Sequence, residues 1–161
     1  MKRTMIALLI AFVALGAAFG GTTTGSLGLQ GTVETNLDMT VTALPAATFT
    51  LADTGVSGTS IATVLFKANK ASTVTITSAN NGVLMVGSLT VAYQFAFENS
   101  GTYVLGSASS GVTLTTTGNS FSLAKTTKEG VTYTAHLWIA ASAVWDAGVF
   151  VDNVTISIAA T

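Results

Sequence analysis

Residues 89–98 read LTVAYQFAFE, in which large apolar residues alternate with small or polar ones. Successive side chains of a β-strand point to opposite faces, so this run predicts a strand with one face in a core and the other toward solvent. A second run of the same kind, VTYTAHLWI, covers residues 131–139. The residues that we expect on the core side of these two strands are Val91, Tyr93, Phe95, Phe97, Val131, Tyr133, Leu137 and Ile139.

Shorter alternating segments fill much of the remaining chain, and glycine or asparagine residues separate them. No window shows sustained helical spacing. The pair Asn81-Gly82 favours a tight type I′ turn, and residues 99–101, Asn-Ser-Gly, read as another turn. Eight to ten short strands with frequent turns and no helix predict an all-β fold, an antiparallel β-sandwich.

The N-terminal residues have the order of a secretory signal. Lys2 and Arg3 precede an unbroken apolar run from Met5 to Leu15, and small residues follow that run. The run is too short to cross about 30 Å of hydrocarbon as a helix, and the order positive, apolar, small is typical of a cleaved export signal. We expect cleavage between Ala18 and Thr22; the alternative is a buried N-terminal helix or an uncleaved anchor. The expected location is the cell surface or the medium, reached through the periplasm of a Gram-negative-type bacterium.

The predicted organisation is a signal peptide at residues 1–20, an N-terminal extension or first strand at residues 21–33, and a β-sandwich domain at residues 34–161. The extension carries Leu27, Leu29 and Val33 at even spacing. That spacing suits a strand with one apolar face. Two interpretations stay open, because these residues fit equally a donor strand that completes the sheet of another subunit and the first strand of their own sandwich.

Charged residues make up only 8 % of the 161-residue chain, and the formal net charge is −1; ordinary globular domains have about 25 % charged residues. Because the chain has no basic patch, we expect no nucleic acid as a partner. Contact with a membrane is expected only through the export signal. The chain has no cysteine, so no disulfide can staple the domain and its stability depends on burial between strands.

Few residues of the chain could perform chemistry. His136 is the only histidine; it falls inside a predicted strand, and no nucleophile-elbow pattern surrounds any serine. A zinc site needs several histidine or cysteine ligands, and no segment has enough carboxylates for calcium. We therefore expect no catalytic residue, no cofactor and no metal ion, and we do not expect an enzyme.

Two tryptophans fall outside the apolar pattern. Trp138 lies on the polar face of its predicted strand, and Trp145 lies in the connection that follows. Tryptophan stacks well on ligands and is common at the centre of interfaces. Both residues are therefore candidate interface or ligand aromatics.

Residues 145–158 read WDAGVFVDNVTISI. They resemble the closing strand of the spore coat protein U domain and of related pilin-like subunits of chaperone–usher systems. Ala147, Gly148 and Asp152 match the motif of that group, and Phe150 stands where its members have tyrosine. The resemblance implies an immunoglobulin-like sandwich that lacks its last strand and is completed by the N-terminal extension of a neighbouring subunit. It also implies a periplasmic chaperone as a partner.

These features predict a secreted, non-enzymatic structural subunit that self-associates into a pilus-like surface appendage or a coat. Its expected partners are copies of itself or related subunits. The alternative is a monomeric extracellular binding module, which would hold a carbohydrate on Trp138 or Trp145.

Overall fold

The computed structural model of the protein describes residues 30, 32–47, 54–141 and 148–161. The folded domain begins at Thr35 and ends at Thr161. Within the described ranges the chain forms nine strands and one short 3-10 helix at Pro45–Ala47, with no α-helix. No helix in that part of the chain has the length and hydropathy needed to span a membrane. The prediction of an all-β fold is confirmed.

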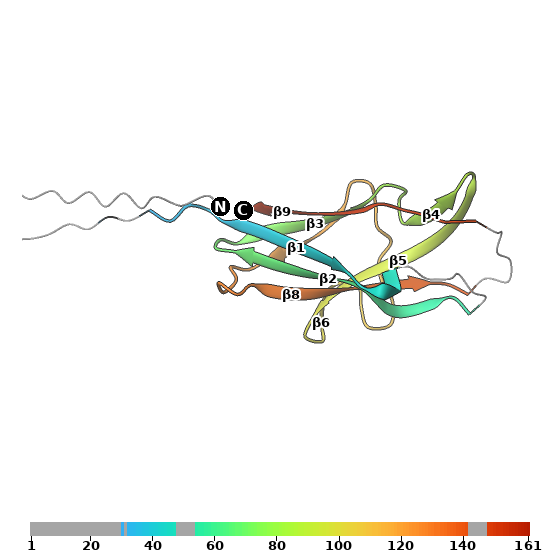
Figure 1. Ribbon diagram of the computed structural model, residues 1–161, viewed down its shortest axis with the longest axis horizontal. Coiled ribbons are helices and arrows are strands. Elements are labelled where there is room, and N and C mark those ends of the chain that lie inside the picture. The colour runs from blue at the N-terminus through green and yellow to red at the C-terminus, as the bar shows by residue number, and fades with distance from the viewer. Residues whose placement is uncertain (1–29, 31, 48–53, 142–147) are drawn as a thin grey trace, which may run out of the picture. The chain divides into compact units, whose positions relative to one another are not determined.

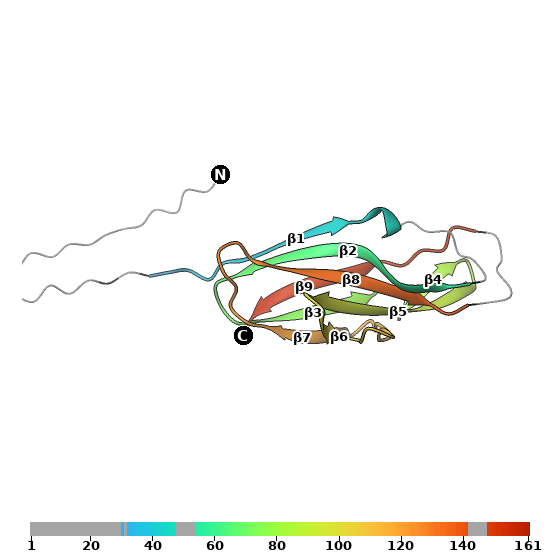
Figure 2. The ribbon, with the colours of Figure 1, turned by 90° about the horizontal axis from the view of Figure 1, so that it is seen from below.

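The strands form two antiparallel sheets (Figures 1 and 2). The larger sheet has the order β1-β2-β8-β5-β4, with β6 paired to β5, and the smaller sheet has the order β7-β3-β9. The strand bounds are β1 Leu37–Ala43, β2 Val56–Ala68, β3 Ser72–Ser78, β4 Val83–Val86, β5 Leu89–Asn99, β6 Thr102–Leu105, β7 Asn119–Leu123, β8 Val131–Ile139 and β9 Val154–Ala160.

One apolar core lies between the two sheets, and aromatic rings from both of them meet in it. The ring centroid of Phe97 on β5 lies 5.6 Å from that of Tyr133 on β8 and 5.8 Å from that of Phe121 on β7. The expected core residues of β5 and β8 are buried, with the exception of Val91 and Val131, which are half-buried. Val131 is the first residue of β8, and Val91 lies where β5 pairs with the short β4, so both are near the margin of the core.

The turn at Asn81-Gly82 has the φ signs expected of the predicted type I′ turn, but it joins strands of different sheets. Both residues have the positive φ that a type I′ turn requires, 56° and 73°. The strands that it joins, however, belong to different sheets, because β3 pairs with β7 and β9 while β4 pairs with β5. The turn therefore carries the chain from one sheet to the other and closes no hairpin.

Strands β1 and β9 are the end strands of their sheets, and each is paired on one side only. Paired residues of neighbouring strands lie on the same face of a sheet. Val41 pairs with the buried Val64, and Val154 pairs with the buried Ser78, so Val41 and Val154 are on the core-facing side of their strands. Val41 nevertheless remains 51 % exposed and Val154 38 % exposed. The core-facing residues that are packed only partly against the core are Leu37, Met39, Ile156 and Ile158. We call this pair of strands, β1 with β9, the open edge.

Both ends of the domain lie beside the turn between β2 and β3. At the start of the domain, the Asn36 N–H donates to Asn69 Oδ1 (2.8 Å), and the Asn69 N–H donates back to the Asn36 carbonyl (3.1 Å). At its end, the Thr161 N–H donates to the Ala71 carbonyl (3.0 Å). Strand β1 therefore begins, and β9 finishes, at one end of the sandwich (Figures 1 and 2).

Candidate functional site

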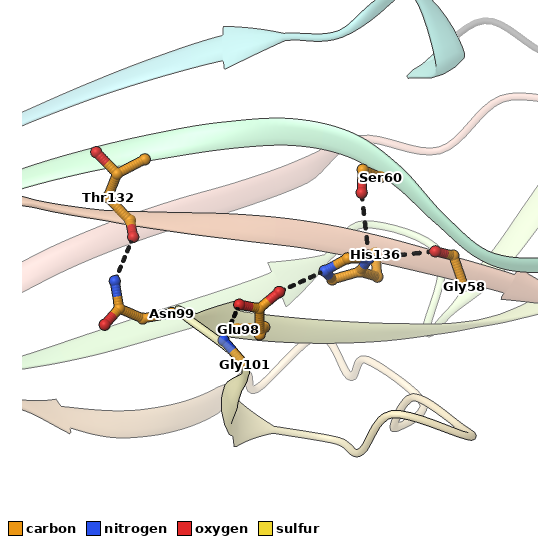
Figure 3. Close-up of polar contacts among 7 residues, drawn as sticks. All are labelled: Gly58, Ser60, Glu98, Asn99, Gly101, Thr132 and His136. Atoms are coloured by element: carbon orange, nitrogen blue, oxygen red, sulfur yellow. Dashed lines mark hydrogen bonds and ion pairs between the residues drawn. The ribbon is translucent and has the colours of Figure 1, made fainter.

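The structure brings His136 together with partners that the sequence did not indicate (Figure 3). His136 lies on the face of the larger sheet opposite the core, between Ser60 on β2 and Ala96 on β5. Its Nε2 lies 3.2 Å from Glu98 Oε2, and only 11 % of its side chain is exposed. Its Nδ1 lies 3.2 Å from the Gly58 carbonyl oxygen and 3.4 Å from Ser60 Oγ. Register shifts in β2 around these residues bend the strand locally, as β-bulges do.

A serine, a histidine and a carboxylate in contact invite comparison with a catalytic triad. Here the three groups come from three neighbouring strands: the Gly58 carbonyl and Ser60 Oγ on β2 face His136 Nδ1, and Glu98 on β5 faces Nε2. The imidazole ring therefore links β2, β8 and β5.

Glu98, which contacts His136, also contacts the turn between β5 and β6. Its Oε1 accepts a hydrogen bond from the Gly101 N–H (2.5 Å), and the neighbouring Asn99 Nδ2 donates to the Thr132 carbonyl on β8 (2.6 Å). The Gly101 N–H, and after it the His136 side chain, hold the pKa of Glu98 below its ordinary value. The side chains of Glu98 and Asn99 therefore hold this turn against the sheet (Figure 3).

The side chain of Trp138 is buried. Its exposed fraction is 9 %, and its ring centroid lies 6.0 Å from that of His136. Gly58 lies against the indole, because a Cβ added at that position would be 3.2 Å from Trp138 Cζ2. Little of the indole is therefore exposed in the folded domain. The other candidate aromatic, Trp145, lies outside the described residues.

A second polar cluster is built around Asp152, a residue of the family-like motif. Its Oδ2 accepts hydrogen bonds from the Tyr93 hydroxyl (2.5 Å) and the Ser78 hydroxyl (2.6 Å). Its Oδ1 accepts from the backbone N–H groups of Asn80 (3.1 Å) and Asn153 (2.8 Å). Asp152 thus joins the end of β3, the middle of β5 and the start of β9 at a single carboxylate.

The groups around Asp152 are themselves buried. Tyr93 is 3 % exposed and Ser78 is 1 % exposed. Burial, together with the hydrogen bond to Asp152, raises the pKa of Tyr93. Ser78 Oγ also accepts from the Gly82 N–H (2.7 Å), which fixes the turn that crosses between the sheets. The arrangement satisfies buried polar groups and offers no exposed reactive atom.

The other predicted site residues are scattered. Gly148 lies against β4, since an added Cβ would be 3.1 Å from Val86, and Phe150 is half-buried. Val33 is 86 % exposed and belongs to no strand. Leu27, Leu29 and Ala147 lie outside the described part of the chain.

Comparison with known proteins adds no relatives. No family model matches the chain, and no curated protein matches it. The resemblance to spore coat protein U and pilin-like subunits therefore stays a prediction. Across the residues that the structure describes, no group of three or more histidine, cysteine, aspartate or glutamate side chains could hold a metal ion.

Proposed function

We propose that this protein is an exported, non-enzymatic structural subunit that associates with copies of itself into a pilus-like appendage or a coat. The observation that carries the proposal is the open edge. There β1 contacts β9, yet both strands leave core-facing side chains such as Val41 and Val154 uncovered. An unpaired edge with apolar side chains promotes uncontrolled association unless a defined strand covers it.

We take the covering strand to be the segment Leu27–Val33 of a second copy. This segment has the length of β1 and β9, which have seven residues each. Val33, at its end, is 86 % exposed and lies outside the folded unit that begins at Thr35. An added strand gains main-chain hydrogen bonds, and alternate side chains that enter the receiving sandwich give specificity.

Replacing Leu29 with aspartate is expected to abolish assembly and to leave the domain folded. The change would place a charge among apolar side chains of the open edge, at a cost of several kcal/mol. Electron microscopy and sedimentation of the exported protein measure assembly, and circular dichroism measures folding. Gln30→Asp is the matched control, because a neighbouring residue in a strand points to the opposite face, and this variant should assemble normally.

Two outcomes would contradict the donor-strand proposal in different ways. If Leu29→Asp unfolds an isolated monomer, the segment is the first strand of its own sandwich. If Leu29→Asp and Gln30→Asp both assemble like the unchanged protein, the segment has no part in association.

Export itself has a simple test. Mass spectrometry of the protein recovered from the periplasm or the medium should give a mature N-terminus between Ala18 and Thr22, since the small residues there suit a signal peptidase. A folded chain that retains Met1 and stays in the cytoplasm would show that the proposed export is wrong.

A further inference from the structure

Two tight turns of the domain hold a glycine N–H in different ways. Gly101, in the turn between β5 and β6, has φ +84°, and Gly130, in the turn between β7 and β8, has φ +90°. The Gly130 N–H donates to the backbone carbonyl of Thr127 (3.1 Å). The Gly101 N–H instead donates to the carboxylate of Glu98 (2.5 Å). The first acceptor cannot change its charge, and the second can.

The groups around Glu98 favour its charged form. The Gly101 N–H faces it from the turn, and His136 Nε2 faces it from β8 at 3.2 Å. From β6, Tyr103 pairs with Glu98, and its ring centroid lies 5.9 Å from that of His136. From β2, Gly58 and Ser60 contribute a carbonyl and a hydroxyl to the same histidine, and neither titrates.

The strand that this turn leads into is short, and only Val104 and Leu105 of it pack, in part, against the core. Strand β6 has four residues and pairs only with β5, and its pairing with β5 shifts register between Phe97 and Glu98. Its side chains at Tyr103, Val104 and Leu105 are half-buried. Segments with few buried contacts open locally at low cost in free energy.

We propose that the Glu98 carboxylate holds the β5–β6 hairpin closed through its hydrogen bond to Gly101. Its protonation opens this hairpin locally, while the β7–β8 turn stays closed. A carboxylate whose pKa is lowered by hydrogen bonds in the folded state stabilises that state at pH values above its ordinary pKa of 4.5, and the stabilisation is lost as the pH falls through the lower folded value. The hairpin is therefore closed at neutral pH and opens in acid, as the pH falls from the ordinary pKa of a glutamate through the lower folded pKa of Glu98.

Amide hydrogen exchange of the full chain, followed by NMR between neutral and acid pH, tests this directly. Rates are expressed as protection factors, which removes the intrinsic pH dependence of exchange. We expect the protection of the Gly101 amide to fall several-fold on acidification and that of Gly130 to stay constant. This comparison needs no variant, because one protein supplies both turns.

Two variants complete the test. Glu98→Gln keeps an oxygen that can accept from Gly101 but cannot ionise, so it should make the protection of Gly101 independent of pH. Glu129→Gln removes the glutamate of the other turn and should leave the acid response of Gly101 as it was. The proposal is overturned if Gly101 and Gly130 respond to acid alike, or if the response of Gly101 persists in Glu98→Gln.

Discussion

Phe97→Ala should lower the free energy of unfolding by about 3–5 kcal/mol, the usual cost of truncating a buried phenylalanine. Phe97 is fully buried, and its ring contacts rings of both sheets, among them Tyr133 and Phe121. Its removal would leave a cavity between the sheets that rigid strands cannot close. Urea denaturation, monitored by circular dichroism, measures the loss.

Thr132→Ala is the control for this experiment. Thr132 lies on β8 next to the core residue Tyr133, but its side chain is exposed. Surface substitutions of this kind usually change stability by less than about 0.5 kcal/mol. Equal losses in Thr132→Ala and Phe97→Ala would show that the strand register described above is wrong.

Asp152→Ala should cost at least about 2 kcal/mol, because each buried donor left without an acceptor costs about 1–3 kcal/mol. The change leaves the hydroxyls of Tyr93 and Ser78 without the acceptor that they share. It also frees the start of β9, so hydrogen exchange in Val154–Ala160 should accelerate more than exchange in β8.

Asp38→Ala is the matched control, since Asp38 is an exposed aspartate on the other strand of the open edge. Its free energy of unfolding should lie within about 0.5 kcal/mol of that of the unchanged protein. A loss in Asp152→Ala no greater than that in Asp38→Ala would mean that the carboxylate does not hold β9 in place.

The sequence predicted the strands better than their arrangement, for a physical reason. Alternation in residues 89–98 and 131–139 reflects which side of one strand is buried, and that is a local property. Which sheet a strand joins depends on pairing between distant segments. The Asn81-Gly82 turn illustrates the difference: its positive φ angles follow from the residue types, whereas its role as a crossing between sheets depends on where β3 and β4 find partners.

The polar clusters were harder to foresee, because their members are far apart in the chain. His136 meets Glu98 across 38 positions and Ser60 across 76. Asp152 meets Tyr93 across 59 positions. One signal was present in the sequence: Tyr93 is the residue of the 89–98 run that carries a hydroxyl on the core face, and a buried tyrosine hydroxyl usually has a hydrogen-bond partner. Nothing local, however, indicated that the partner would be Asp152.

The position of the two domain ends has a mechanical consequence. A force that draws Thr35 and Thr161 apart acts first on the pair Leu37–Ala68 of β1 and β2 and on the pair Ser72–Ala160 of β3 and β9. These are the terminal rungs of each ladder, so the strands would peel away one hydrogen bond at a time instead of sliding against all of them together. Tension applied through the ends of a single copy therefore meets the domain in its weakest direction. A fibre of such subunits would carry load only if the pull entered along the length of a strand.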